Sequence, residues 1–193
     1  SAFKLLIWLT ALDQGFTPIP VYVHAPQEEG EWSPGAASLA WLHRSLTALD
    51  ADLRARGSRL LLREGPSAPA LQALVEQTGA VAVFWNRKYE PATQPRDASL
   101  KKRLREQGLQ VESFNGCLLF EPWDLATQQG GPYKVFTPFW RSALAQWRAP
   151  ATWDAPGALP AFEGALPGES LDAWRLAPAL GWDAGFWKVW PPG

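Results

Sequence analysis

Short apolar runs alternate with helical patterns along the first part of the chain, and this alternation restricts the fold more than any other feature of the sequence. Each run is bounded by glycine or proline, as expected for strands that are buried on both faces. The runs lie at 3–9, 18–25, 58–64, 80–85 and 108–114. Strand and helix repeated in this way predict a parallel sheet with right-handed crossovers.

Helical patterns fill most of the connections between these runs. Residues 36–56 place leucines three and four positions apart, and Gly57 ends the pattern. Ser33 is the predicted cap of this helix, with Pro34 at its first position. Further helices are predicted over 67–78, 95–107 and 137–148.

We expect a five-stranded, doubly wound parallel sheet of the Rossmann-like or flavodoxin-like type, with strand order 3-2-1-4-5 and helices on both faces. The first crossover does not fit, because parallel neighbours need a connection of about a dozen residues or more. Residues 10–17 separate the first two runs, which is too short for a loop and a helix. A segment missing after Leu9 explains this, and an unorthodox connection of the first strand is the alternative.

The pattern changes after Phe114, where periodicity is weak and tryptophan is frequent. Eight of the 12 tryptophans lie from Trp123 onward, which indicates a surface that another part of the protein covers. Residues 149–170 are rich in alanine, proline and glycine, a composition typical of a linker. The sequence thus divides into an α/β domain over 1–148 and an irregular Trp/Pro-rich extension over 149–193.

Composition and motifs argue against several classes of protein. Acidic and basic residues nearly cancel, at 19 against 18, so the whole chain lacks the positive charge of a nucleic-acid-binding protein. A single cysteine, Cys117, and two histidines offer neither a disulfide framework nor zinc-type spacing. The start of the chain resembles neither a signal peptide nor a membrane span, so we expect no membrane contact and a cytoplasmic location.

A run of polar and aromatic residues, Asn86 to Glu90, follows the fourth apolar run directly, and we call it the polar segment. In open parallel sheets, ligands bind beyond the carboxyl ends of the strands, where the strand order reverses. There Asn86 would hydrogen-bond a ligand and Arg87 would bind an anionic or planar group. Tyr89 would stack on a ring, and Glu90 would accept a hydrogen bond. His24, at the end of the second run, is a further candidate, and an ordinary surface loop is the alternative.

Three stretches of the sequence resemble one known family. They are WNRKYEP at 85–91, SFNGCLLFEP at 113–122 and GGPYKVFTPFWR at 130–141. Over residues 3–193 the chain is similar to the amino-terminal α/β domain of the DNA photolyase and cryptochrome family. The resemblance implies that this domain holds a light-harvesting antenna chromophore. By family position, its pocket would use Ser38, Leu39 and Trp41 at the start of the first predicted helix, together with the polar segment.

The resemblance leaves the identity of the chromophore open. Family members bind methenyltetrahydrofolate or 8-hydroxy-deazaflavin in this domain. Folate-binding members often carry Asn-Glu shortly after the YE dipeptide, where this chain has Ala92 and Thr93. Folate is therefore not supported residue by residue, and a deazaflavin or an empty pocket are the alternatives.

Whole members of the family bind FAD in a helical domain and use light to split ultraviolet-induced pyrimidine dimers in DNA. The resemblance implies that this chain is the antenna domain of a DNA photolyase and is not catalytic by itself, because FAD and the contact with damaged DNA belong to an absent helical domain. That domain is the expected partner in cis, and the resemblance implies that residues 149–193 are the interdomain linker that leads to it. We also expect the fragment to self-associate through its exposed tryptophan-rich surface.

Three other functions remain open from the sequence. The chain could be a freestanding flavodoxin-like protein that binds a nucleotide or flavin. It could be a fragment of a cryptochrome-type photoreceptor, or an interaction module whose tryptophan-rich tail recruits a partner without any small molecule.

Overall fold

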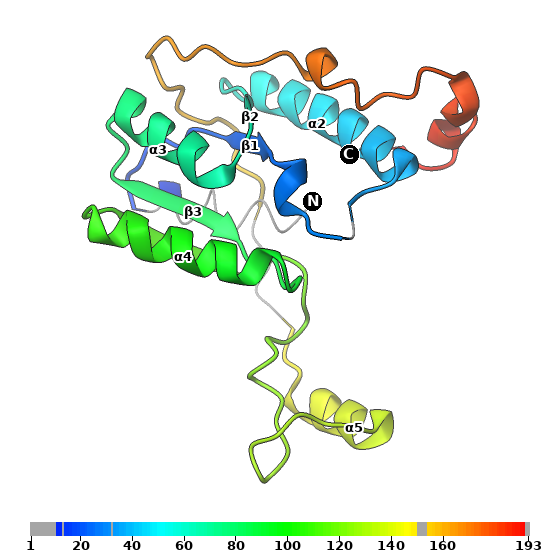
Figure 1. Cartoon of the computed structure of the whole chain (residues 1–193). Coiled ribbons are helices and arrows are strands. Elements are labelled where there is room, and N and C mark those ends of the chain that lie inside the picture. The colour runs from blue at the N-terminus through cyan, green and yellow to red at the C-terminus, as the bar shows by residue number, and fades with distance from the viewer. Residues whose placement is uncertain (1–10, 13, 32, 150–153, 192–193) are drawn as a thin grey trace.

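The computed structural model describes residues 11–12, 14–31, 33–149 and 154–191 (Figure 1). Strands and helices alternate in these residues as β1 (Val21–His24), α2 (Ala36–Ala55), β2 (Leu61–Glu64), α3 (Ser67–Thr78), β3 (Ala82–Asn86), α4 (Thr93–Glu106) and β4 (Gln110–Phe114). They are followed by α5 (Phe136–Gln146), and the short 3-10 helices are η1 (Pro26–Glu28), η2 (Leu171–Trp174), η3 (Gly181–Asp183) and η4 (Phe186–Lys188). The predicted strand over 3–9 and the segment expected to be missing after Leu9 lie outside the described residues.

The strands form two parallel pairs. In the first pair Val21 of β1 stands opposite Leu61 of β2, and in the second pair Ala82 of β3 stands opposite Gln110 of β4. These are the neighbours expected at the two ends of the order 3-2-1-4-5, so the α/β class and these pairings are confirmed. The strand that would join the pairs into one sheet falls in residues 3–9, and the five-stranded order stays a prediction.

Helices cover both faces of the β1–β2 pair. On one face Leu46 of α2 packs in a cluster with Tyr22 and Leu62. On the other face Leu74 of α3 packs in a cluster with Leu61. Leu61 and Leu62 point to opposite faces because successive side chains of a strand alternate. The apolar runs therefore fill two layers of core, as the sequence predicts for strands buried on both sides.

The β3–β4 pair has a helix on one face and aromatic rings on the other. Leu104 of α4, which is 1% exposed, packs with Val83 and Val111. On the opposite face the rings of Phe16 and Phe84 have centres 6.0 Å apart, and that of Phe114 lies 6.2 Å from Phe84. All three rings are half-buried.

Helix α2 begins later than its predicted cap. Gly35 is the residue before the helix, with an extended backbone, and no side chain caps the first turn. The Ser33 hydroxyl donates instead to the backbone oxygen of Gly30 (3.5 Å), so the prediction of Ser33 as the cap and Pro34 as the first residue was wrong. A serine that closes a local turn is no longer free to cap the helix that follows.

The carboxyl-terminal residues 154–191, which we call the strap, wrap around the outer edge of β2. The Glu169 N–H donates to the Leu62 backbone oxygen (3.3 Å), extending the hydrogen bonding of that edge. Leu166 packs with the cluster on the α3 face, and Trp174 with the cluster on the α2 face. The strap therefore contributes to both layers of core, while the predicted domain boundary at residue 149 stays a prediction.

Residues 121–148, which we call the aromatic arm, extend away from the strands and end in α5 (Figure 1). One side of the arm has a small interior, where Leu125 and Ala143 are buried. The other side is apolar and open, with Phe136 70% and Trp140 44% exposed. An apolar helix face of this kind is usually covered by another part of a protein.

Candidate ligand-binding site

The polar segment begins at the carboxyl end of β3, as predicted. Asn86 is the last residue of the strand and stands opposite Phe114 of β4. Its side chain lies against the backbone of Gly116, where an added Cβ would come within 2.5 Å of Asn86 Cγ. Gly116 therefore permits the close approach that sets the position of the Asn86 amide.

Arg87 and Tyr89 converge on one carboxylate that the sequence analysis did not single out. Arg87 Nη2 donates to Glu121 Oε1 (2.5 Å), and the Tyr89 hydroxyl donates to Glu121 Oε2 (2.7 Å). Burial, reinforced by the hydrogen bond with Glu121, raises the pKa of Tyr89, which keeps its hydroxyl protonated as a donor. Arg87 and Tyr89, which were expected to contact a ligand, thus both bind Glu121 of the same chain.

Glu90 lies just before helix α4 and binds its first turn. Its backbone oxygen accepts hydrogen bonds from the N–H groups of Thr93 (3.0 Å) and Gln94 (3.1 Å), and its carboxylate accepts one from the Thr93 hydroxyl (3.0 Å). The hydrogen bond from the backbone N–H of Glu90 itself, assisted by Thr93, lowers the pKa of the Glu90 carboxyl. The residue expected to accept a bond from a ligand is therefore engaged at the beginning of a helix.

The turn after β1 faces the polar segment across the carboxyl ends of the strands. Glu29 of this turn pairs with Lys88 (3.4 Å). Its neighbour Glu28 accepts hydrogen bonds from the backbone N–H (2.9 Å) and the hydroxyl (2.6 Å) of Ser67, and it also pairs with Arg96 (3.2 Å). A carboxylate at the first residue of α3 complements the positive end of the helix. These contacts connect the two strand pairs at the carboxyl ends of the strands, where the sequence predicts the ligand to bind.

His24, the predicted candidate on β1, is packed against the strap. Its ring stacks on Trp174 with centres 4.9 Å apart and an angle of 28° between the planes. The indole N–H of Trp174 donates to Glu169 (3.0 Å), which fixes the ring that covers His24. The structure thus separates His24 from the polar segment and places it beneath the carboxyl-terminal residues.

Ser38 and Trp41 lie near the start of α2 and are exposed. The Trp41 ring is 38% exposed and has its neighbours in the strap, with Trp187 5.9 Å and Phe186 6.4 Å away between ring centres. No contact between these α2 residues and the polar segment is found in the described part of the chain. The predicted site residues therefore fall into three groups: the polar segment, His24, and the start of α2.

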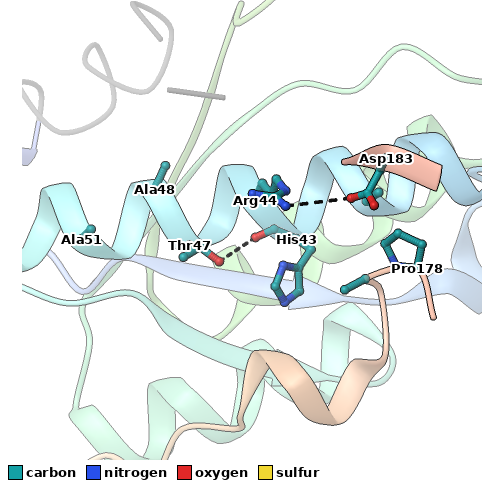
Figure 2. A pocket seen from close by; sticks show the side chains of 9 residues that line it. His43, Arg44, Thr47, Ala48, Ala51, Pro178 and Asp183 are labelled. Atoms are coloured by element: carbon teal, nitrogen blue, oxygen red, sulfur yellow. Dashed lines mark hydrogen bonds and ion pairs between the residues drawn. The ribbon is translucent and has the colours of Figure 1, made fainter. Parts of the chain in front are cut away.

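A groove of about 400 Å³ runs along α2, between the helix and the strap (Figure 2). It is lined by Ala40, His43, Arg44, Thr47, Ala48, Ala51, Ala177, Pro178 and Asp183. Small alanine side chains leave the space, and the strap supplies the opposite wall. The sequence does not predict the groove. The alanines on one side of the helix are evident in the sequence, but local sequence does not indicate which distant segment packs over them.

The polar groups of the groove are linked to the ring of Trp187, which lies beside Trp41. Arg44 lies 3.9 Å from Asp183, and its guanidinium stands 4.4 Å from the centre of the Trp187 ring. The Trp187 indole N–H donates to the same Asp183 carboxylate (2.8 Å). Arg44 therefore has its charge balanced by a carboxylate and its flat surface held against a ring, which orients it at the edge of the groove.

This groove has the features of a small-molecule site. Such sites measure roughly 300–1,000 Å³ and combine apolar walls with a few placed polar groups. The walls here are mostly apolar, and the polar groups at the edge already have partners in the chain: Arg44 pairs with Asp183, His43 lies 3.4 Å from Asp172, and the Thr47 hydroxyl donates to the His43 backbone oxygen. Within the described residues no group of three or more potential metal ligands occurs, and none of the helices there is long and apolar enough to cross a membrane.

Comparison with known proteins gives consistent matches. The family model for DNA photolyase matches residues 5–158. The deoxyribodipyrimidine photo-lyase of Agrobacterium fabrum is 41% identical over 189 residues, which are 97% of this chain and 39% of that protein. Cryptochrome-1 of Arabidopsis thaliana is 41% identical over 128 residues, or 66% of this chain and 19% of that protein. The chain thus spans well under half the length of these relatives.

Solved structures agree with these sequence matches. A bacterial class III photolyase from Agrobacterium tumefaciens superimposes with a TM-score of 0.90 at 40% identity, covering 98% of this chain and 39% of the other. An archaeal photolyase from Sulfolobus tokodaii, solved with two FAD molecules, has a TM-score of 0.68 at 22% identity over 91% of this chain and 38% of its own. The second likeness shows the fold alone.

Proposed function

Because this chain belongs to the DNA photolyase family, we propose that it is the domain of a deoxyribodipyrimidine photo-lyase that binds the light-harvesting chromophore. The repair of pyrimidine dimers, the FAD that drives it and the contact with damaged DNA are proposed for the longer protein to which such a domain belongs. The chain alone would have no catalytic residue. The similarity of nearly the whole chain to a photo-lyase and to a class III photolyase supports this proposal.

We place the chromophore on the face of α2, and the observation that carries this placement is the groove there, whose lining residue Arg44 lies over Trp187, the neighbour of Trp41. In the polar segment, Arg87 and Tyr89 bind Glu121, and the Glu90 carboxylate accepts a hydrogen bond from Thr93. The start of α2 presents the exposed Trp41 on the same helix that forms one wall of the groove. Of the residues predicted from the sequence, Ser38 and Trp41 are therefore the proposed contacts.

The residues of this region fit a planar ring system that carries an acidic group. Trp41 offers a ring face for stacking, and the alanine floor lets a flat molecule approach the helix closely. Arg44, held by Asp183, would pair with a carboxylate or phosphate group of the ligand. Both methenyltetrahydrofolate and 8-hydroxy-deazaflavin have flat rings with acidic extensions, so the chromophore stays open between them.

The chain's own part in such a reaction is to set geometry. When bound, the chromophore would absorb light and pass the excitation energy to a flavin. The strap and α2 would hold its ring at a fixed distance and angle from that flavin, because the ion pair of Asp183 with Arg44 and the hydrogen bond between Asp172 and His43 join the two walls. The walls would also keep water from one side of the ring.

The aromatic arm is the proposed docking surface for the helical FAD domain in cis. Its open side carries Phe136, Trp140, Leu144 and Trp147, all between 44% and 70% exposed. The relatives are more than twice as long as this chain, which supports a further domain as the cover of this surface. The lone Cys117, which is exposed, fits the reducing cytoplasm expected from the sequence.

Reconstitution tests the function and the place of the site together. The purified chain is mixed with methenyltetrahydrofolate, 8-hydroxy-deazaflavin or FAD, and bound pigment is measured by absorbance after gel filtration and by fluorescence titration. We expect one of the first two to bind. Stoichiometric FAD alone would favour a freestanding flavin-binding protein, and a colourless product with all three would contradict the proposal.

Two matched pairs of variants locate the pigment. Ala48→Leu fills the groove and should abolish binding, whereas Ala98→Leu on the exposed side of α4 should leave it unchanged. Trp41→Ala should weaken binding about tenfold, the effect of losing one stacked ring. Tyr89→Phe should bind normally. A loss with Tyr89→Phe and none with Trp41→Ala would move the site to the polar segment.

A further inference from the structure

The aromatic arm is joined to the strands through its first residues. Both oxygens of Glu121 are bound there, one by Arg87 and one by Tyr89. The Arg87 guanidinium also lies over the ring of Trp123, 5.4 Å from its centre. Among the described residues, the hydrogen bonds of 125–148 all run to other residues of the arm. In the described part of the chain, the hydrogen bonds and ring contacts of the arm thus reach the end of β3 through Glu121 and Trp123.

Glu121 is well suited to fix an orientation. Its side chain is 10% exposed, so water competes little for its two oxygens. The backbone N–H of Glu121 donates to the Asp124 carboxylate (3.2 Å), and the backbone N–H of Asp124 donates back to the backbone oxygen of Glu121 (3.0 Å). The Glu121 carboxylate is thus bound to the residues that follow β3, while the Glu121 backbone forms the turn with Asp124 from which the arm extends.

This contact is separate from the hydrophobic core. The three clusters found among the described residues include Val83 and Trp85 of β3 but no residue of the polar segment and none of the arm. Loosening the contact should therefore free the arm without unfolding the strands and helices behind it.

We infer that Glu121 is the positioning residue of the aromatic arm. Through Arg87 and Tyr89 it couples the end of β3 to the direction in which α5 presents its exposed rings. The identity of the docking partner rests on the proposed function, but the orientation of the arm does not. In an antenna protein this orientation would set the angle between the chromophore domain and the domain that receives the energy.

Distance measurements between spin labels test this inference in the whole 193-residue chain. Cys117→Ser removes the native thiol, and Ser99→Cys on α4 and Ala145→Cys on α5 provide exposed labelling sites. In this background we expect one narrow distribution of distances between the labels. Glu121→Ala should lose the narrow peak and give a broad one, while circular dichroism and the melting temperature of the core change little.

A neighbouring ion pair provides the control. Lys88→Ala breaks the pair with Glu29, which does not involve the arm, and it should keep the narrow peak. If Glu121→Ala does not fold, Tyr89→Phe removes one of the two bonds and should broaden the peak partially. A broad peak in the background, or an unchanged peak in the folded Glu121 or Tyr89 variant, overturns the inference. No pigment or partner is present, so this result is independent of the proposed function.

Discussion

At the scale of single residues, charge is paired across long stretches of sequence. Arg87 and Glu121 lie 34 positions apart in the chain, yet their side chains form one of the least exposed ion pairs described. Glu28 joins the first residue of α3 to Arg96 of α4. Partly buried pairs of this kind fix how segments meet, because an unpaired charge there would be costly.

Tyr22 gives a prediction for alkaline pH. Burial, followed by the negative charge of Glu29, raises the pKa of Tyr22 from its ordinary value of 10.0 to about 12. Because the folded pKa lies above the unfolded one, this stabilisation is complete below pH 10 and is lost as the pH rises through about 12. Tyr22→Phe should remove that loss.

Urea unfolding of both proteins at a series of pH values measures the effect. Between pH 10 and about 12 the free energy of unfolding of the wild type should fall by roughly 2–3 kcal/mol more than that of Tyr22→Phe. Parallel curves for the two proteins would show that Tyr22 ionises as it does in the unfolded chain.

At the scale of elements, helices and strands follow their local sequence patterns, whereas the conformation of some turns depends on residues that are distant in the sequence. Helix α3 spans the predicted residues and ends at Gly79, whose positive φ of 63° suits a residue without a side chain. The turn after β4 is different, because Gly116 is required by its neighbour Asn86 and its φ is not positive. No periodic pattern in the sequence marks such a position.

Gly116→Ala should therefore destabilise the protein. Its Cβ would lie 2.5 Å from Asn86 Cγ and 2.7 Å from Asn86 Cβ, so the end of β3 or the turn must shift. We expect a loss of about 1–3 kcal/mol in the free energy of unfolding, as in overpacked interiors. Gly131→Ala, whose nearest neighbouring atom is 3.8 Å away, is the control and should change stability by less than about 0.5 kcal/mol. Equal effects of the two changes would contradict the steric argument.

At the scale of the whole molecule, the strap and the aromatic arm have opposite characters. The strap returns to the strands and buries Leu159, Leu166, Trp174 and Leu176. The arm leaves the strands (Figure 1), and the rings of Phe136, Trp140 and Trp147 on it are exposed. The late tryptophans, which look alike in the sequence, are thus divided between core and surface.

Two tryptophans of the strap test this division. Trp174 is 8% exposed and Trp190 is 60% exposed. Trp174→Ala should lower the free energy of unfolding of the whole chain by about 3–5 kcal/mol, because it removes a large side chain from the core. Trp190→Ala should change it by less than about 0.5 kcal/mol. Thermal or urea unfolding measures both, and similar small effects would show that the strap is only loosely attached.

Self-association through the arm stays a prediction from the sequence. Sedimentation velocity over a range of concentrations should show dimers or larger species, because an uncovered apolar face favours contact between copies. Trp140→Glu in α5 should shift the population toward monomer. Val81→Glu, at an exposed apolar residue outside the arm, should not. A monomer at every concentration would contradict the prediction.

The sequence by itself determined the kinds of element, their order and the family, because apolar periodicity and glycine stops are local properties of a chain. It also placed Asn86 to Glu90 correctly at the end of β3. Tertiary structure alone decided that Arg87 and Tyr89 bind Glu121, that His24 lies under Trp174, and that the groove opens on α2. These contacts join residues far apart in the chain, and a side chain's partner depends on which segments meet in space rather than on its own neighbours in sequence.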